Sequence, residues 1–346
     1  TGTGHSTDRD INLTGAAGTI RIAGNGRGGL VLNGNITIMA DGNKTLMLHG
    51  QNTQNVINGT LQRNGRTLSL TVNPNTGDND LYGTGKWTLT NDASDFNGNV
   101  IVNVGALELA GDLGNGSGAF SVLGNLSVAR TIDLATTNFN GRRFAFTGGG
   151  DNLGAAGAPG SNGTIIFNDP NAGTATLGNN ITFTSSYSST AGPGNPEIMN
   201  NGAKVIVING NLTSGATGNR SWILDGSNTG TNTIAGSISN GTGNTVSVIK
   251  EGTGTWRLAG ANTFTGAVTI TRGTLEITGG STIGDAAVVN LNNAGSDGSS
   301  AGGAALRVLS SETIGGLASS PAQANSLPHW VAMNSTASST SANGIS

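Results

Sequence analysis

The sequence GTGTWRLAGANTFTGAVTITRGTLEI, at residues 252–277, is the stretch that predicts the fold of this chain. It contains three short runs in which apolar and polar residues alternate, at 256–258, 268–270 and 275–277. Turns that contain glycine or asparagine separate these runs, and alternation bounded by glycine indicates short half-buried strands and not helix. The stretch therefore predicts three strands joined by tight turns.

A second copy of this stretch, GTGKWTLTNDASDFNGNVIVNVGALEL, occupies residues 83–109. A tryptophan, a phenylalanine and two glycines recur in the same order in both copies, at Trp87, Phe96, Gly98 and Gly105 and at Trp256, Phe264, Gly266 and Gly273. The tryptophans could stack on sugar rings, but recurrence at equivalent positions favours packing in or against a repeating scaffold. We therefore expect all eight residues to be structural repeat positions.

The repeated stretch belongs to a larger duplication. Three segments between residues 34 and 53 recur at an offset of 176, and this offset drifts to 169 at the tryptophans. A slow drift is expected when duplicated sequences change only in the lengths of their turns. We predict repeat units at about 9–118 and 130–285, the second with an insertion at about 135–205. Because insertions on repetitive scaffolds map to binding faces, the insertion is where we expect specific contacts.

Composition excludes several classes of protein. Of the 346 residues, 59 are glycine and only 10% are charged, against roughly 25% charged residues in ordinary domains. The absence of cysteine excludes disulfides and thiolate metal sites. A net charge of −3 without a basic cluster argues against a nucleic-acid partner, and no apolar run is long enough for this segment to insert in a membrane. Because no signal-peptide pattern opens the sequence, we expect a mature or excised piece of a longer polypeptide.

Short strands, glycine turns and the absence of a helical period leave three architectures: tandem sandwiches, a propeller or a parallel β-helix. Sandwiches need a polar linker and two-residue hairpin turns, and a propeller needs a period of about 40 to 50 residues. The sequence has neither. We predict an all-β, right-handed parallel β-helix (β-solenoid) with an internal duplication. Residues 1–318 form its single continuous body, and the Ser-, Ala- and Asn-rich residues 319–346 form a tail, cap or linker.

Residues 252–277 resemble the autotransporter-associated β-strand repeat, also called the passenger-associated transport repeat. The segments 252–256, 262–266 and 273–275 follow its pattern closely, whereas residues 91–95 of the earlier copy depart from it. The resemblance covers about 27 residues, or about 54 with the weaker copy. It implies a β-helical segment of a secreted or surface-displayed bacterial protein, and it does not imply an enzyme.

Few residues are arranged for chemistry. Gly24, Gly26 and Gly29 match a dinucleotide-binding pattern, but an apolar strand pattern follows them, whereas a phosphate-binding loop leads into a helix. The histidines, at 5, 49 and 329, lack metal-ligand spacing, and no serine lies in a nucleophile-elbow motif. We predict no catalytic residue and no cofactor.

Pairs of aspartates are the remaining candidates. They are Asp8 with Asp10, Asp78 with Asp80, and Asp92 with Asp95, all in Asn- and Gly-rich segments where aspartate is a frequent turn former. Neighbours two apart on a strand share a face, so Asp78 and Asp80 are weak candidates for a calcium site. The glycine-rich calcium nonapeptide pattern is absent.

These observations predict a non-enzymatic, extracellular, structural or adhesive β-solenoid segment of a bacterial surface protein or fibre. Open ends of a β-helix expose strand edges, so homo-oligomer or filament neighbours are expected there. A host or glycan surface ligand is the expected partner of the insertion. The alternative is a glycan-binding or polysaccharide-degrading β-helix, which predicts acidic and aromatic side chains gathered on one exposed face.

Overall fold

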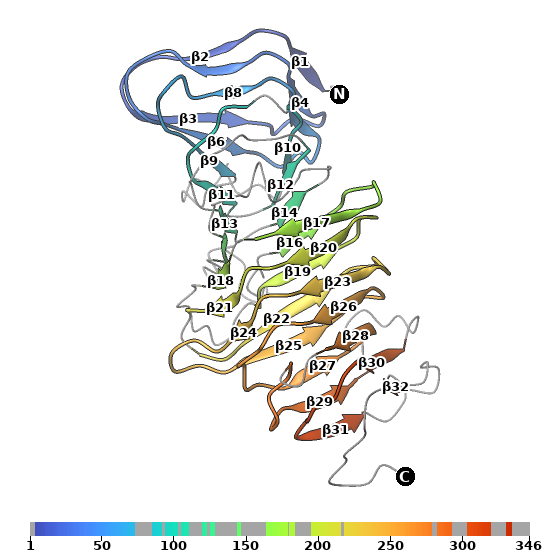
Figure 1. Ribbon diagram of the computed structural model, residues 1–346. Helices are drawn as coiled ribbons and strands as arrows, with labels where there is room; N and C mark the ends of the chain where they lie inside the picture. The colour runs from blue at the N-terminus through green and yellow to red at the C-terminus, as the bar shows by residue number, and fades with distance from the viewer. Residues whose placement is uncertain are drawn as a thin grey trace, which may run out of the picture.

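The computed structural model (Figure 1) consists of short strands joined by turns. The structure describes residues 4–72, 85–91, 94–102, 105–110, 120–122, 125–128, 144–146, 164–178, 180–183, 195–215, 218–278, 282–292, 303–319 and 330–333. Within these residues every regular element is a strand, and none is a helix. The prediction of an all-β protein is confirmed.

The described strands form four sheets, which we call A to D. Sheet A has 13 strands in the order β1 (His5–Thr7), β4 (Leu30–Leu32), β7 (Asn55–Ile57), β10 (Lys86–Leu89), β12 (Ala106–Leu109), β14 (Asn125–Val128), β16 (Thr164–Phe167), β19 (Glu197–Asn200), β22 (Arg220–Asp225), β25 (Val246–Lys250), β27 (Val268–Ile270), β29 (Val288–Leu291) and β31 (Gly316–Ser319). Sheet B has three strands in the order β2 (Ile11–Leu13), β5 (Ile36–Ile38) and β8 (Leu61–Gln62).

Sheet C has nine strands in the order β3 (Gly18–Ala23), β6 (Lys44–His49), β9 (Leu68–Val72), β11 (Val100–Val102), β13 (Phe120–Val122), β15 (Phe144–Phe146), β18 (Ile181–Phe183), β21 (Leu212–Ser214) and β24 (Ile238–Ser239). Sheet D has seven strands in the order β17 (Thr174–Leu177), β20 (Val205–Ile208), β23 (Thr231–Ile234), β26 (Thr255–Leu258), β28 (Gly273–Ile277), β30 (Ala304–Val308) and β32 (Trp330–Met333). Adjacent strands in all four sheets pair in parallel, for example β6 with β9 and β26 with β28.

The chain visits the sheets in a regular order. Strands β1, β2 and β3 belong to sheets A, B and C, and β4, β5 and β6 repeat that order. From β16 to β24 the order is A, D, C, repeated three times. His5 pairs with Leu30 and Val31 with Val56, and each pair is 25 residues apart. Parallel strands are therefore stacked coil upon coil from one end of the molecule to the other (Figure 1), an arrangement consistent with a solenoid.

The core lies between the sheets and is built by alternation along each short strand. Leu46, Leu70 and Val100 share one register position on β6, β9 and β11, and all three are fully buried. Residues between the inward positions are partly exposed, as in the buried–intermediate–buried pattern of β11. Each short strand therefore contributes one or two apolar side chains to a continuous stack, which is how a chain with so little charge forms a core.

The two copies of the duplication correspond strand by strand. Strands β5 to β12 match β21 to β28 in order, and corresponding strands make corresponding pairs: β6–β9–β11 matches β22–β25–β27, and β7–β10–β12 matches β23–β26–β28. The matching strands lie in different sheets in the two copies. Strands β6–β9–β11 lie in sheet C and their counterparts in sheet A, strands β7–β10–β12 lie in sheet A and their counterparts in sheet D, and strands β5–β8 lie in sheet B and their counterparts, β21–β24, in sheet C. The second copy is thus displaced by one sheet around the stack.

The region expected to be an insertion also supplies strands. Strands β15 to β19 lie between residues 135 and 205, and they pair within sheets A, C and D. Toward the end of the chain, β32 lies within residues 319–346 and pairs with β30 in sheet D. Both regions therefore add to the stacked sheets where the structure describes them.

Candidate functional site

The aromatic repeat positions lie inside the stack. Trp87 and Trp256 have no exposed surface, and Phe96 and Phe264 are 1% exposed. Trp256 donates from Nε1 to the carbonyl oxygen of Asp225 at 2.8 Å. Trp87 donates in the same way to the carbonyl oxygen of His49 at 3.3 Å. A ring buried to this extent has no free face on which a sugar could stack, so these side chains pack in the core.

The repeat glycines hold positions at which a side chain would collide with the next coil. A Cβ at Gly98 would lie 2.1 Å from the carbonyl oxygen of Leu68, and one at Gly266 would lie 2.4 Å from that of Val246. Gly105 and Gly273 adopt φ angles of 71° and 68°, which glycine adopts without strain. Each pair of equivalent glycines therefore meets the same steric requirement.

Asparagines in the turns and near the beginnings of strands make matching hydrogen bonds in the two copies. The amide N–H of Leu30 donates to Oδ1 of Asn55, and that of Ile206 donates to Oδ1 of Asn232, both at 3.1 Å. The side chain of Asn52 donates to the carbonyl oxygen of Gly26, as that of Asn228 does to the carbonyl oxygen of Gly202. The amide N–H of Thr67 donates to Oδ1 of Asn43, as that of Thr245 does to Oδ1 of Asn219. The offset of 176 extends back to residues 26 and 202. These asparagines satisfy backbone groups that the turns leave without a strand partner.

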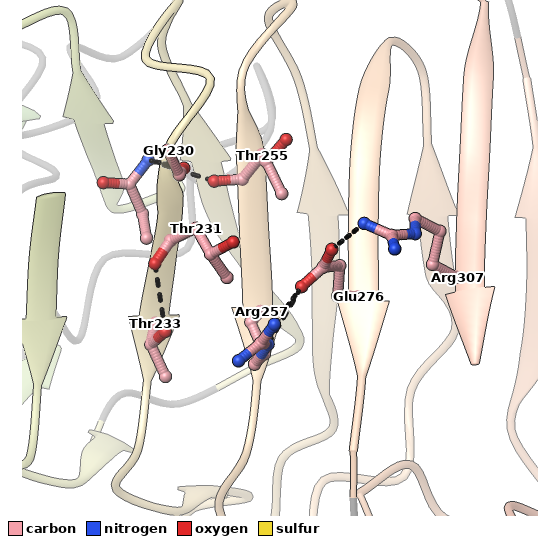
Figure 2. Close-up of polar contacts among 8 residues, drawn as sticks. Gly230, Thr231, Thr233, Thr255, Arg257, Glu276 and Arg307 are labelled. Carbon is pink, nitrogen blue, oxygen red and sulfur yellow. Dashed lines mark hydrogen bonds and ion pairs between the residues drawn. The ribbon is translucent and has the colours of Figure 1, made fainter. Parts of the chain in front are cut away.

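The outer face of sheet D carries a group of three charged residues, which we call the arginine ladder: Arg257, Glu276 and Arg307. They occupy one register position on β26, β28 and β30. Arg257 donates to Oε2 of Glu276 from Nε at 2.9 Å and from Nη2 at 2.6 Å, and Nη1 of Arg307 donates to Oε1. Figure 2 shows the carboxylate held between the two guanidinium groups.

Burial distinguishes the three members of the arginine ladder. The side chain of Glu276 is 2% exposed, whereas those of Arg257 and Arg307 are 33% and 45% exposed. Beside the ladder, Thr231, Thr255 and Thr274 occupy one register position on β23, β26 and β28. The face therefore presents two half-exposed cations and a row of threonines around one covered carboxylate.

The first copy has different residues where the arginine ladder lies. Glu108 is the counterpart of Glu276, and Thr88 and Ser127 occupy the register positions on either side of it. Glu108 pairs instead with Lys86, at 2.8 Å and diagonally across the strands. A cation–carboxylate contact thus recurs in both copies, but two arginines around one glutamate occur in the second.

The outer face of sheet A carries carboxylates. Glu197, on β19, accepts a hydrogen bond from Thr164 at 2.8 Å and lies against Asp225, on β22. Burial, followed by the hydrogen bond with Asp225, raises the pKa of Glu197 to about 7. Asp225 is therefore close enough to Glu197 to oppose the ionisation of its carboxyl group.

Lys250 is the one lysine on β25, and its side chain points inward. It has no exposed surface, and its ammonium donates to the carbonyl oxygens of Glu251, Gly252 (2.8 Å) and Arg272 (3.2 Å). Burial lowers the pKa of Lys250 to about 7. A second buried charge, Lys204, lies 2.8 Å from Asp169. Both lysines are bonded within the protein and present little or no surface to a ligand.

Each aspartate of the expected pairs that the structure describes is bonded to another residue. Asp78, Asp80 and Asp92 lie outside the described residues. Asp95 forms an ion pair with Arg63 at 3.0 Å, and Asp8 and Asp10 accept hydrogen bonds from the side chain of Asn33 and the backbone N–H of Asn35. Among the residues that the structure describes, no three His, Asp or Glu side chains are grouped to hold a metal ion.

The remaining candidates are accounted for as follows. Gly24, Gly26 and Gly29 precede β4, a strand, so they form a turn. His5 is exposed on β1, His329 lies outside the described residues, and His49 is 2% exposed. Burial, together with the charge of Arg21, lowers the pKa of His49. A shallow polar depression on sheet A is lined by Thr269, Asn290, Asn292, Ala318 and Ser319.

Stacked parallel sheets with buried aromatic repeats and polar outer faces define a class of repetitive, all-β scaffold proteins. Comparison with known sequences identifies the repeat: residues 82–109 and 248–277 match the passenger-associated-transport-repeat family. The chain therefore carries two segments that match this repeat, as the resemblance predicted. Both matched segments include a buried tryptophan, a buried phenylalanine and the glycine at positive φ.

One relative shows where such segments are found. The chain is 52% identical over 66 residues to the adhesin BmaC autotransporter of Brucella suis biovar 1 (strain 1330). The alignment covers 19% of this chain and 2% of that adhesin, so the chain matches a small part of a very long protein. No solved structure matches the chain. Within the described residues no helix is long and apolar enough to cross a membrane.

Proposed function

We propose that the chain is an adhesive, non-enzymatic segment of a bacterial autotransporter passenger displayed at the cell surface. The similarity to an autotransporter adhesin carries this proposal, and the two matched repeats support it. A stack of parallel strands suits the role, because each coil contacts its neighbours and stability is largely a sum of coil and interface terms. Such a segment holds its outer faces at a distance from the cell.

The finer architecture that we propose is a right-handed parallel β-helix. The strand order supports it, because the chain visits sheets A, B and C in turn from β1 to β9 and sheets A, D and C in turn from β16 to β24, and right-handed connections between parallel strands are strongly preferred. In this proposal residues 1–318 form one continuous body with duplicated units at about 9–118 and 130–285, and the region at about 135–205 supplies contact surfaces. Residues 319–346 act as a tail, cap or linker. Small-angle scattering tests this shape, since a closed β-helix of constant width gives a constant cross-section.

The non-enzymatic role rests on the outer faces. The alternative needs acidic and aromatic side chains gathered on one exposed face, and the carboxylates Glu197 and Asp225 lie on the outer face of sheet A. The five aromatic side chains of the repeats and of β22 whose burial is described are inside: Trp87, Phe96, Trp222, Trp256 and Phe264. These features do not favour the alternative of a polysaccharide-degrading β-helix.

Adhesion is tested with beads coated with the folded chain and applied to cultured epithelial cells and to extracellular-matrix proteins. We expect saturable attachment that soluble chain competes away. Beads coated with the urea-unfolded chain are the control, because they carry the same composition without the stacked faces. Attachment equal to that control on every surface would contradict an adhesive role.

End-to-end self-assembly is a second proposal, and one observation favours it. Strands β1, β2 and β3 each have a single neighbour among the described strands, so three strand edges lie together at one end of the stack. Such edges template pairing with another chain. Electron microscopy of the purified chain over a range of concentrations decides the matter: rods that lengthen with concentration support assembly, and short rods at every concentration rule it out.

A further inference from the structure

We propose that the arginine ladder on sheet D is a binding site for polyanionic glycans, those that carry carboxylate or sulfate groups. The inference rests on the proposed adhesive function, because it names the chemistry of a surface ligand. It rests independently on the geometry of Arg257, Glu276 and Arg307, which the repeat family match does not supply.

The two guanidinium groups have donors to spare. Arg257 directs Nε and Nη2 at Glu276, and Arg307 directs Nη1 at the same carboxylate. A guanidinium carries five N–H donors in a planar fork that matches carboxylate and sulfate oxygens. Both side chains are at least one-third exposed, so the donors that Glu276 does not use face solvent.

Glu276 positions the two arginines. Its carboxylate is covered and bonded from both sides, so each guanidinium is already ordered before a ligand arrives. Ordering a long side chain in advance reduces the entropy lost on binding. Two cations for one carboxylate leave the ladder with one positive charge. Because Arg257 and Arg307 lie two strands apart, their anchors are separated by roughly 9 to 10 Å along the stack, which suits a polymer that carries repeated charges.

The surroundings favour an anion on sheet D over sheet A. The threonine row, Thr231, Thr255 and Thr274, places small hydrogen-bonding side chains beside the ladder. The outer face of sheet A carries Glu197 and Asp225, which repel a polyanion. The two half-exposed arginines and this carboxylate pair are thus on different sheets.

The first copy provides residues for a matched variant. At the positions of Thr255, Arg257 and Arg307 it has lysine, threonine and serine, and its lysine pairs with the equivalent glutamate at 2.8 Å. The triple variant Thr255→Lys, Arg257→Thr, Arg307→Ser therefore removes both guanidinium groups and still gives Glu276 a cationic partner. A second variant, Glu276→Gln, keeps the arginines and removes the carboxylate that opposes a bound anion.

Binding is measured by biolayer interferometry with the whole chain at low and at physiological salt. Immobilised dextran sulfate tests sulfate recognition, immobilised polygalacturonate tests carboxylate recognition, and neutral dextran is the control. We expect salt-sensitive binding to one or both polyanions, weakened about tenfold or more in the triple variant, since charge-assisted hydrogen bonds are the strong ones. The Glu276→Gln variant raises the net charge of the arginine ladder from one to two, and its amide oxygen still accepts a hydrogen bond from an arginine, so it is expected to bind more tightly than the natural sequence at low salt.

Three results would overturn the proposal. They are equal polyanion binding by the triple variant and the natural chain, binding to neither polyanion, and a salt-sensitive self-association in place of glycan binding. The triple variant must unfold at the same temperature as the natural chain. If it does not, the comparison of Glu276→Gln with the natural chain is used to test the site. Polyanion binding that is unchanged in the triple variant, together with bead attachment above the unfolded control, would refute this site and leave the adhesive function standing.

Discussion

Replacing Trp256 with alanine tests the claim that the repeat positions are core residues. The ring has no exposed surface, and it lies in register between Asn232 on β23 and Leu275 on β28. Truncating a buried tryptophan to alanine costs about 3–5 kcal/mol. The variant also removes the Nε1 donor from the carbonyl of Asp225, which adds about 1 kcal/mol. We expect a loss of about 5 kcal/mol in the free energy of unfolding.

The assay is urea unfolding followed by far-ultraviolet circular dichroism. Thr255→Ala is the matched control, because Thr255 is the neighbouring residue on β26 and is only partly buried. Since coils contribute separately to the stability of a stack, the loss should appear in the part of the transition that includes β26. Equal midpoints for the two variants would refute the assignment of Trp256 to the core.

Three further predictions follow from glycine packing and buried charge. Gly266→Ala should lower the free energy of unfolding by about 1–3 kcal/mol through overpacking. Gly178→Ala is the control, because a Cβ there meets no atom within 4 Å and should leave the urea midpoint unchanged. Similar midpoints for the two variants would contradict the close approach of Gly266 to the next coil. The pKa of His49 in the folded protein lies below 6.5, so the unfolded chain takes up the proton first and stability falls as pH drops below 6.5. His49→Leu should weaken this acid dependence, and a pH profile identical to that of the natural chain would contradict the role of His49. The pKa of Lys250 is about 7 in the folded protein, against 10.5 for an unperturbed lysine, so the stability should rise between pH 7 and 10.5. Lys250→Met should flatten that rise in thermal unfolding, and a rise that persists in the variant would argue that the lysine does not titrate in the core.

The sequence allowed the strands and their turns to be predicted because these depend on local patterns. Alternation in 268–270 gave β27, and the glycine recurring at 105 and 273 marked a turn that needs positive φ. Recurrence at an offset of 176 also marked turn asparagines such as Asn43 and Asn219, which make the same hydrogen bond in both copies. Signals of this kind lie within one coil or between copies of one coil.

Contacts between coils could not be predicted, because they depend on coil length. Glu276 lies 19 residues from Arg257 and 31 from Arg307, so no fixed spacing identifies the arginine ladder. The displacement of the second copy by one sheet could not be predicted from the sequence for the same reason. An offset between repeats is a number of residues, and it does not show in which sheet a strand lies. Lys250 was missed as well: it occupies an inward position that alternation assigns to an apolar residue.

A cross-linking measurement tests most directly the claim that consecutive coils stack in parallel register. Thr182 and Thr213 are opposed on β18 and β21, with their hydroxyl oxygens 3.1 Å apart. The chain has no cysteine of its own, so the double variant Thr182→Cys, Thr213→Cys has a single possible intramolecular disulfide. We expect rapid oxidation to a monomeric disulfide, detected by mass spectrometry of the peptides under non-reducing conditions. Two free thiols after oxidation, or cross-links only between chains, would contradict the stacked architecture.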